Sequence, residues 1–222
     1  LYGMALLYGA GGELDYAGIR SAVDPASPLA LAGLALMLVG LASRIGLVPF
    51  HAWLPGVQEG APTAVSAFLS VAVPTTLFFV LLRFVLHAVP EFEASLRPIF
   101  GALSIASIVL GSAMAAFQRN VKRMLAWSGV AHAGTLLVGF VAGTPDAFAA
   151  VGFYVSSSLL ATLGAFGVVL ALATGGRESE RIDDFAGLGR SRPGLAACMT
   201  LFLLALVGIP GTAGFWAKWL LF

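Results

Sequence analysis

Residues 208–218 read GIPGTAGFWAK, and they interrupt an apolar stretch that runs from Gly194 to Phe222. Proline cannot donate a backbone hydrogen bond and glycine is conformationally loose, so this segment predicts a break in a helix. Inside a bilayer, a broken helix is tolerated where the freed backbone groups face protein or a water-lined cavity, and such places commonly bind ions. The segment therefore predicts a membrane protein with a polar site within the hydrocarbon.

Lys218 follows this break directly. Ten of the 12 basic residues are arginines, which stay protonated. The two lysines, Lys122 and Lys218, are therefore the basic residues whose positions say most about function. In one interpretation, Lys218 lies beside the break and holds or releases a proton according to its surroundings. In the other, the helix is continuous and Lys218 reaches the outer interface with its flexible side chain. Lys122 is expected in a loop, as an anchor on the cytoplasmic side.

The composition of the whole chain requires a lipid environment. Of its 222 residues, 59% are hydrophobic and 10% are charged, whereas about a quarter are charged in an average soluble domain. The net charge of +1 excludes a nucleic-acid-binding face, which needs an excess of Lys and Arg. The single cysteine, Cys198, cannot form an intrachain disulfide, a zinc site or an iron–sulfur site by itself, so no metal or cofactor is expected in this chain.

Apolar runs of sufficient length predict six membrane spans and part of a seventh, since a helical span takes about 20 residues. The six runs are 29–47, 64–87, 99–117, 121–142, 147–173 and 194–222, with 1–10 as the partial one. Of the connections, the polar stretch 175–193 is long enough for an amphipathic surface segment. The expected fold class is all-α, a polytopic transmembrane helix bundle. Residues 1–222 are expected to form a single membrane domain that is incomplete at both ends, because the chain begins and stops within apolar stretches.

The basic residues predict the orientation of these spans, because Lys and Arg in short loops stay on the cytoplasmic side. One basic group begins the run 121–142 and the other precedes the last run, so they lie two crossings apart and share a side. The groups are Arg119, Lys122 and Arg123, and then Arg177, Arg181, Arg190 and Arg192. The alternate connections hold only Arg20 and Arg97. By parity, the segment Pro49–Trp53 is also expected in a cytoplasmic loop.

A histidine is expected near the bilayer midplane, because His132 lies ten residues after Lys122, about 15 Å along a helix. Its neutral imidazole suits a proton relay, and it equally suits a structural histidine bonded to a neighbour. Ser128, one turn earlier on the same face, is the expected partner. Arg44 is by spacing an interfacial anchor, since its guanidinium stays protonated. All eleven acidic residues fall outside the predicted spans, so a carboxylate for Lys218 is expected from elsewhere.

Four blocks of sequence carry a resemblance to a known family. They are LVPFHAWLP at 47–55, EGAPT at 59–63, NVKRMLAWS at 120–128 with AHAG at 131–134, and GIPGTAGFWAK at 208–218. In content and order they resemble the antiporter-like membrane subunits of respiratory complex I, the NADH:quinone oxidoreductase, a family of proton-conducting membrane transporters. The resemblance spans nearly the whole chain.

This resemblance implies a subunit of about fourteen helices with two inverted repeats, each containing a discontinuous helix. It implies proton translocation driven by redox chemistry elsewhere, with other membrane subunits, the lipid bilayer and quinone at a neighbouring subunit as partners. It also implies a multi-pass protein of a bacterial inner (plasma) membrane. Lys218 is similar to the family's exit-side lysine and His132 to its central relay histidine. Arg44 falls where the family usually has a lysine on the first broken helix, with His51 just beyond it. The resemblance therefore makes Lys218, His132, Arg44 and His51 the four candidates for the proton path.

Several positions depart from the family's pattern. Arg44 replaces a lysine, Pro74 stands where a central lysine is usual, and Gly56 and Gln58 stand where an Asp and a Tyr are common. Arginine cannot readily give up a proton, so the first half-channel is the part that these changes affect. Two alternatives follow: a diverged scaffold paralogue that no longer conducts, and a subunit of a related Mrp-type cation/proton antiporter or hydrogenase complex. The transported ion is then a proton or a sodium ion.

Overall fold

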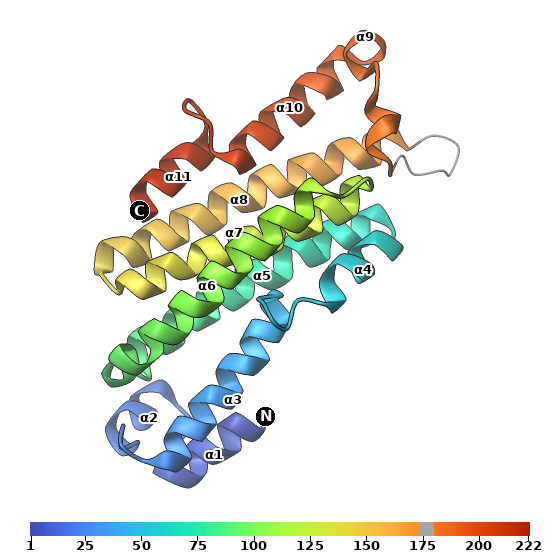
Figure 1. Cartoon of the computed structure of the whole chain (residues 1–222). Coiled ribbons are helices and arrows are strands. Elements are labelled where there is room, and N and C mark those ends of the chain that lie inside the picture. Colours follow the sequence, from blue (N-terminus) through green and yellow to red (C-terminus); the bar gives the residue numbers. More distant parts are fainter. Residues whose placement is uncertain (174–179) are drawn as a thin grey trace.

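The computed structural model describes residues 1–173 and 180–222 and is built from helices (Figure 1). Within these ranges, extended pairing is limited to a single bridge between Asn120 and Arg181. The predicted all-α fold class is confirmed. Arg177, one of the basic residues used to predict the orientation, lies outside the described residues.

Five helices of the described part are long and apolar enough to cross a membrane. They are α3 (Pro28–Ile45), α5 (Thr63–His87), α6 (Glu93–Ala116), α7 (Val121–Ala142) and α8 (Pro145–Leu172). They coincide with the predicted runs, except that α6 begins earlier, at Glu93. Two acidic residues, Glu93 of α6 and Asp146 of α8, lie within the long helices, contrary to the prediction. Asp146 occupies the first turn of α8, where a carboxylate interacts favourably with the helix dipole.

Polar caps explain where several helices begin. Ser27, Asn120 and Thr144 each accept a hydrogen bond from the backbone N–H three residues later, at the starts of α3, α7 and α8. Pro28 and Pro145 occupy the first helical position, where no backbone donor is needed. The Ser-Pro and Thr-Pro pairs in the sequence therefore mark true helix starts.

The remaining helices are short. They are α1 (Tyr2–Gly11), α2 (Tyr16–Ala22), α4 (Trp53–Gly60), α9 (Leu188–Ser191), α10 (Pro193–Val207) and α11 (Ala213–Leu221), with 3₁₀ turns η1 (Pro90–Phe92) and η2 (Ile182–Phe185). The predicted run 194–222 is thus divided into α10 and α11, as its helix breakers indicate. The described part of the polar stretch 175–193 contains η2 and α9 instead of a continuous amphipathic helix.

Small residues allow α6 and α7 to pack closely against each other. A Cβ atom on Gly111 would lie 2.6 Å from the backbone nitrogen of Ala131, and one on Gly134 would lie 2.8 Å from Cβ of Ser107. Ser104 also donates a hydrogen bond to the carbonyl of Gly134, at 2.7 Å. Close backbone approach through small residues is a common way for helices to associate in lipid. It gives α7, which carries His132, a fixed place in the bundle.

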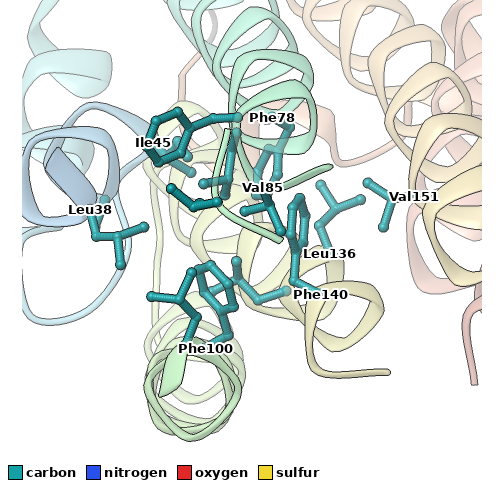
Figure 2. Close-up of a cluster of buried hydrophobic side chains, with 14 of the residues drawn as sticks. Leu38, Ile45, Phe78, Val85, Phe100, Leu136, Phe140 and Val151 are labelled. Atoms are coloured by element: carbon teal, nitrogen blue, oxygen red, sulfur yellow. The ribbon is translucent and has the colours of Figure 1, made fainter. Parts of the chain in front are cut away.

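The largest buried apolar cluster joins α3 to the long helices (Figure 2). Phe140 of α7 lies at its centre, with ring centroids 5.5 Å from Phe100 of α6 and 6.4 Å from Phe78 of α5. Figure 2 shows Ile45, the last residue of α3, on one side of this cluster and Val151 of α8 on another. The cluster therefore fixes the end of α3 relative to α7.

Two interrupted helices run in opposite directions through the bundle. Figure 1 shows α3 followed by α4 along one flank, and α10 followed by α11 in the reverse direction along the other. This arrangement agrees with the inverted repeats and discontinuous helices that the resemblance implies.

The interruption between α3 and α4 lies beside the middle of α6 and the first half of α7. Val48 N–H donates to Ser107 Oγ at 3.0 Å, near the middle of α6, and the ring of His51 lies 5.1 Å from that of Trp127 on α7. The prediction that Pro49–Trp53 forms a cytoplasmic loop is therefore wrong. Counting membrane crossings from the basic connections gives the wrong answer here, because α4 continues in the direction of α3. The chain has therefore not finished crossing the membrane at residue 49.

The basic connections do meet at one end of the bundle, as predicted. Ile182 N–H donates to the carbonyl of Arg119 at 3.0 Å, which joins the start of α7 to the segment after α8. Arg97, from an alternate connection, lies at the other end, where its guanidinium approaches the carbonyl of Ala142 at 3.4 Å.

Candidate functional site

The second break is a defined turn between two half-helices. Gly208 caps the C-terminus of α10, and its φ of 84° is accessible to glycine without strain. The carbonyl of Leu204 accepts hydrogen bonds from the backbone of both Gly208, at 2.9 Å, and Ile209, at 3.1 Å. Thr212 then caps α11 by accepting from Phe215 N–H at 3.4 Å. The glycine and proline residues of this segment thus form an ordered interruption, as the sequence predicts.

Lys218 reaches back across this break. Its ammonium donates to the carbonyl of Val207 at 2.7 Å and to that of Leu206 at 3.3 Å, which are the last carbonyls of α10. A helix C-terminus carries partial negative charge and exposed carbonyls, so it favours a cation at this place. The interpretation in which Lys218 extends along an unbroken helix is therefore wrong. Lys218 lies beside the break, half-buried.

Glycine permits this approach of α11 to α10. A Cβ atom on Gly214 would overlap the carbonyl oxygen of Ala205, and one on Gly208 would lie 3.0 Å from Cδ of Lys218. Both glycines are thus required by the packing of the lysine and of the half-helix that carries it.

His132 has a hydrogen-bond partner that differs from the predicted one. Its Nδ1 lies 2.8 Å from the hydroxyl of Tyr154 on α8, whereas Ser128 was the expected partner. Tyr154 is buried, at 2% exposed. This contact occupies Nδ1, so Nε2 is the ring nitrogen that does not bond to Tyr154. Tyr154 lies 22 residues further along the chain, so only the packing of α7 against α8 brings the two side chains together.

Three cavities meet at His132. A small one of about 10 Å³ joins it to Tyr154, Ser158 and Lys218. A larger one, the Lys218 cavity, has a volume of about 410 Å³ and is also lined by Ser128 and Lys218. The third, the Gln58 cavity, has a volume of about 60 Å³ and extends from His132 toward α4. His132 therefore lines both the cavities around the second break and a separate cavity that extends toward Gln58.

The Gln58 cavity is lined by α4, α5, α7 and α8, and by Ile45 at the end of α3. Gln58 is 1% exposed, and its Oε1 has no hydrogen-bond partner among the described residues. Ser70 and Pro74 of α5 also line this cavity. Proline has no N–H for the carbonyl of Ser70 one turn earlier, so this helix turn lacks a backbone hydrogen bond. The site where the family usually has a lysine is thus a mostly apolar pocket that contains a few neutral polar groups.

Arg44 and His51 lie at the first break, apart from Lys218. Arg44 is exposed, and neither residue lines the three cavities around His132. His51 Nδ1 and Trp127 Nε1 are both buried without a hydrogen-bond partner in the described part of the chain. Of the four predicted site residues, the structure brings Lys218 and His132 together and leaves Arg44 and His51 separate from them.

Lys122 is not a solvent-exposed loop anchor, contrary to the prediction. It is the second residue of α7 and is 1% exposed. Its ammonium forms an ion pair with Glu180, at 2.6 Å, and donates to the carbonyl of Ala61 at 2.9 Å. Glu180 is not predictable as its partner from the sequence, because it lies on a different segment and follows a polar stretch without a pattern.

No group of three or more His, Cys, Asp or Glu side chains that could hold a metal ion occurs in ranges 1–173 and 180–222. The polar groups around His132 are instead hydroxyls, an amide, a lysine and backbone carbonyls. Such groups can bind water, and of them the lysine can also take up and release a proton.

The architecture and this site together define an antiporter-like membrane subunit: a helical bundle with two oppositely directed broken helices, one of which holds a lysine near an internal histidine. The chain belongs to the NADH:quinone oxidoreductase/Mrp antiporter transmembrane family, whose sequence model matches residues 1–222. The resemblance seen in the four sequence blocks is thus confirmed.

Similar proteins include several subunits N, the complex I subunit that the sequence blocks most resemble. NADH-quinone oxidoreductase subunit N of Alkalilimnicola ehrlichii is 41% identical, with 99% of this chain and 46% of that protein covered. Subunit N of Gemmatimonas aurantiaca is 44% identical, with 99% and 43% covered. The chain spans less than half the length of these relatives.

Solved structures show the same fold. Respiratory complex I from Thermus thermophilus with bound aureothin contains a chain that is 36% identical, with a TM-score of 0.81 and 99% of this chain and 47% of that chain covered. The membrane-bound sulfane sulfur reductase, an archaeal respiratory complex, gives 28% identity, a TM-score of 0.88, and 99% and 45% covered. The Mrp complex from Dietzia sp., at 22% identity and a TM-score of 0.87 over 99% of this chain and 40% of that chain, shares the fold alone.

Proposed function

We propose that this chain is the proton-conducting part of a membrane subunit of an NADH:quinone oxidoreductase. Quinone reduction elsewhere in the complex would drive proton movement through this bundle. The observation that carries the proposal is the contact of the Lys218 ammonium with the last carbonyls of α10, in a cavity that it shares with His132. The subunit N relatives support the choice of complex.

The geometry suggests how a proton passes between the two residues. In the tautomer in which Nδ1–H of His132 donates to the oxygen of Tyr154, the imidazole is oriented and Nε2 accepts a proton. When protonated His132 passes this proton to a neutral Lys218 amine, directly or through water, the ammonium forms and binds the carbonyls of Leu206 and Val207. Release of the proton to the exit side regenerates the amine and breaks these charge-assisted hydrogen bonds. Each transfer moves one proton and leaves the chain unchanged.

The partners and location follow from the same proposal. The chain would lie in a bacterial inner membrane, in contact with lipid and with the other membrane subunits of the complex. Quinone would bind at a neighbouring subunit, and the flavin and clusters that carry electrons would be held elsewhere. The proposed enzyme activity therefore belongs to the whole complex, to which this chain contributes ion movement.

A non-conducting scaffold is the second candidate, and two observations favour it. Arg44 is exposed at the first break, and Pro74 replaces the usual lysine beside the Gln58 cavity. In a scaffold the fold would be kept while proton movement through Lys218 would not matter. An Mrp-type antiporter or hydrogenase subunit would use Lys218 as proposed here but would move Na⁺ or take another redox partner.

The decisive experiment is Lys218→Ala in the assembled complex. We expect normal assembly and electron transfer to quinone, with proton translocation per electron reduced by about tenfold or more, because loss of a proton-transfer group typically costs at least this much. Lys218→Arg should also impair translocation, since guanidinium stays charged. Trp219→Phe, on the exposed neighbouring position, is the control. Normal proton translocation in Lys218→Ala, at normal complex content, would contradict the proposal and favour the scaffold.

A further inference from the structure

The start of α7 contains a buried ammonium paired with an accessible carboxylate. The side chain of Lys122 is 2% exposed and that of Glu180 is 35% exposed, with Nζ and Oε1 2.6 Å apart. Asn120 donates to the other carboxylate oxygen of Glu180, at 3.1 Å, and Val121 N–H donates to its backbone carbonyl, at 2.7 Å. Glu180 is therefore held with one face toward solvent and one toward Lys122.

A neighbouring ion pair has a different character. Arg123 and Glu59 lie 2.9 Å apart, but their side chains are 42% and 36% exposed. Both members of that pair are solvated, so it resembles an ordinary surface salt bridge of small energetic value. Burying the Lys122 ammonium costs several kcal/mol of desolvation before it is paired. A contact that only held the two segments together would not need a buried charge.

Two serine hydroxyls of α5 lie inward from Lys122, and each donates to a backbone carbonyl, Ser66 most closely to that of Gln58 at 2.6 Å. The carbonyl of Ala61 accepts from both Lys122 Nζ, at 2.9 Å, and Ser66 Oγ, at 3.3 Å. Ser66 is 0% exposed, and one turn further along α5 the Ser70 hydroxyl donates to the carbonyl of Ser66 at 2.7 Å. Ser70 lines the Gln58 cavity, which ends at His132.

The Gln58 cavity can hold water along the rest of this route. Its volume of about 60 Å³ exceeds the 10–15 Å³ or so that one water molecule needs by the same measure. The unpartnered Oε1 of Gln58 and the carbonyl of Ser70, which Pro74 cannot bond, supply acceptors for this water. A proton can then reach His132 without a lysine at residue 74.

We propose that Glu180 and Lys122 form the proton-uptake pair of this chain, and that water, held beside Ser66 and Ser70 and in the Gln58 cavity, carries the proton from them to His132. This inference rests on the proposed function and assigns its uptake side. The Lys122 ammonium releases a proton inward and becomes an amine. Glu180, protonated from the aqueous side, returns a proton to that amine and becomes a carboxylate again. One proton enters per cycle and both groups return to their starting states.

The test is Lys122→Arg in the assembled complex, with Glu180→Gln as a second variant and Glu59→Gln as the matched control. Arginine keeps the charge and can keep the ion pair, but it cannot release a proton. We expect proton translocation per electron to fall by about tenfold or more in both variants, at normal complex content, and to stay normal in Glu59→Gln. Glu180→Asp, which retains a titratable carboxyl, should recover part of the rate.

The outcomes separate this inference from the proposed function. Normal translocation in Lys122→Arg or Glu180→Gln, together with loss in Lys218→Ala, would overturn the uptake pair and leave the proposed function intact. Normal translocation in all three variants would overturn both. If Lys122→Arg does not assemble, Glu180→Gln alone decides, because glutamine is nearly isosteric with glutamate and can keep the hydrogen bond to Asn120.

Discussion

The two breaks share one backbone design and differ in where the cation lies. At the first break, the carbonyl of Ala42 accepts hydrogen bonds from the backbone N–H groups of Gly46 and Leu47, each at 2.9 Å. At the second break, the carbonyl of Leu204 likewise accepts two. Gly46 and Gly208 both have a left-handed conformation, with φ of 87° and 84°. The next turn also matches, since Phe50 N–H donates to Leu47 and Thr212 N–H to Ile209.

The side chains at the two breaks are arranged differently. Arg44 precedes the first break and is exposed. There, neutral groups satisfy the backbone: Ser107 Oγ accepts from Val48 N–H at 3.0 Å, and Trp53 Nε1 donates to the carbonyl of Ser43 at 2.8 Å. Lys218 follows the second break and donates directly to the carbonyls at the end of α10.

This difference shows that an interrupted helix is not by itself an ion site. The break exposes carbonyls in both halves, but only at the second does a side chain that can lose its charge bind them. A proton leaving Lys218 changes the hydrogen bonding of the second break, whereas the hydrogen bonds of Ser107 and Trp53 at the first break involve neutral groups that keep their protons. Substitutions at matched positions of the two breaks test this difference.

The largest effect is expected from adding a methyl group to each second half-helix. Gly214→Ala would place a Cβ atom against the carbonyl of Ala205, whereas a Cβ on Gly56 of α4 meets nothing within 4 Å. Overpacking typically costs about 1–3 kcal/mol, and this overlap is with backbone that cannot rotate away, so Gly214→Ala should strongly reduce complex content. Gly56→Ala should assemble normally, since alanine favours a helix by about 1 kcal/mol. Immunoblots of purified membranes measure both, and equal yields would disprove the tight packing of α11.

A smaller effect is expected from replacing the histidine near each break. His132→Gln should assemble, because glutamine can still bond to Tyr154, but it cannot accept and return a proton. We expect proton translocation to fall by about tenfold, without recovery at any pH between about 5 and 8. His51→Gln should lose much less, since His51 lines none of the three cavities at His132. Vesicle proton uptake per complex is the measurement, and a wild-type rate in His132→Gln would make that histidine structural.

The smallest effect is expected from the hydroxyls that hold the two turns. Ser107→Ala removes the acceptor of Val48 N–H, and Thr212→Ala removes the cap of α11. Each should cost about 1 kcal/mol, a typical value for one hydrogen bond or one helix cap, and should lower the thermal stability of the complex slightly. Ser107→Ala should leave translocation unchanged, whereas Thr212→Ala should reduce it because α11 carries Lys218. A reversed order of these two rates would contradict the functional contrast between the breaks.

Local sequence determined the spans, the caps and the second break. Whether a run of about 20 residues enters lipid depends on its own composition, and whether a helix can continue through Pro210 and Gly211 depends on their own backbones. Lys218 and His132 were identified in the same way, as ionisable residues in apolar surroundings. The family resemblance added the first broken helix, which charge and parity had placed in a loop.

Tertiary structure alone decided which of these groups meet. Tyr154 approaches His132, and Glu180 pairs with Lys122, only because α8 and the segment after it pack against α7. The depth of Pro49–Trp53 likewise depends on contacts with α6 and α7. Helix formation and lipid insertion are set by neighbours along the chain, whereas hydrogen bonds and ion pairs between helices depend on their register and rotation, which packing determines.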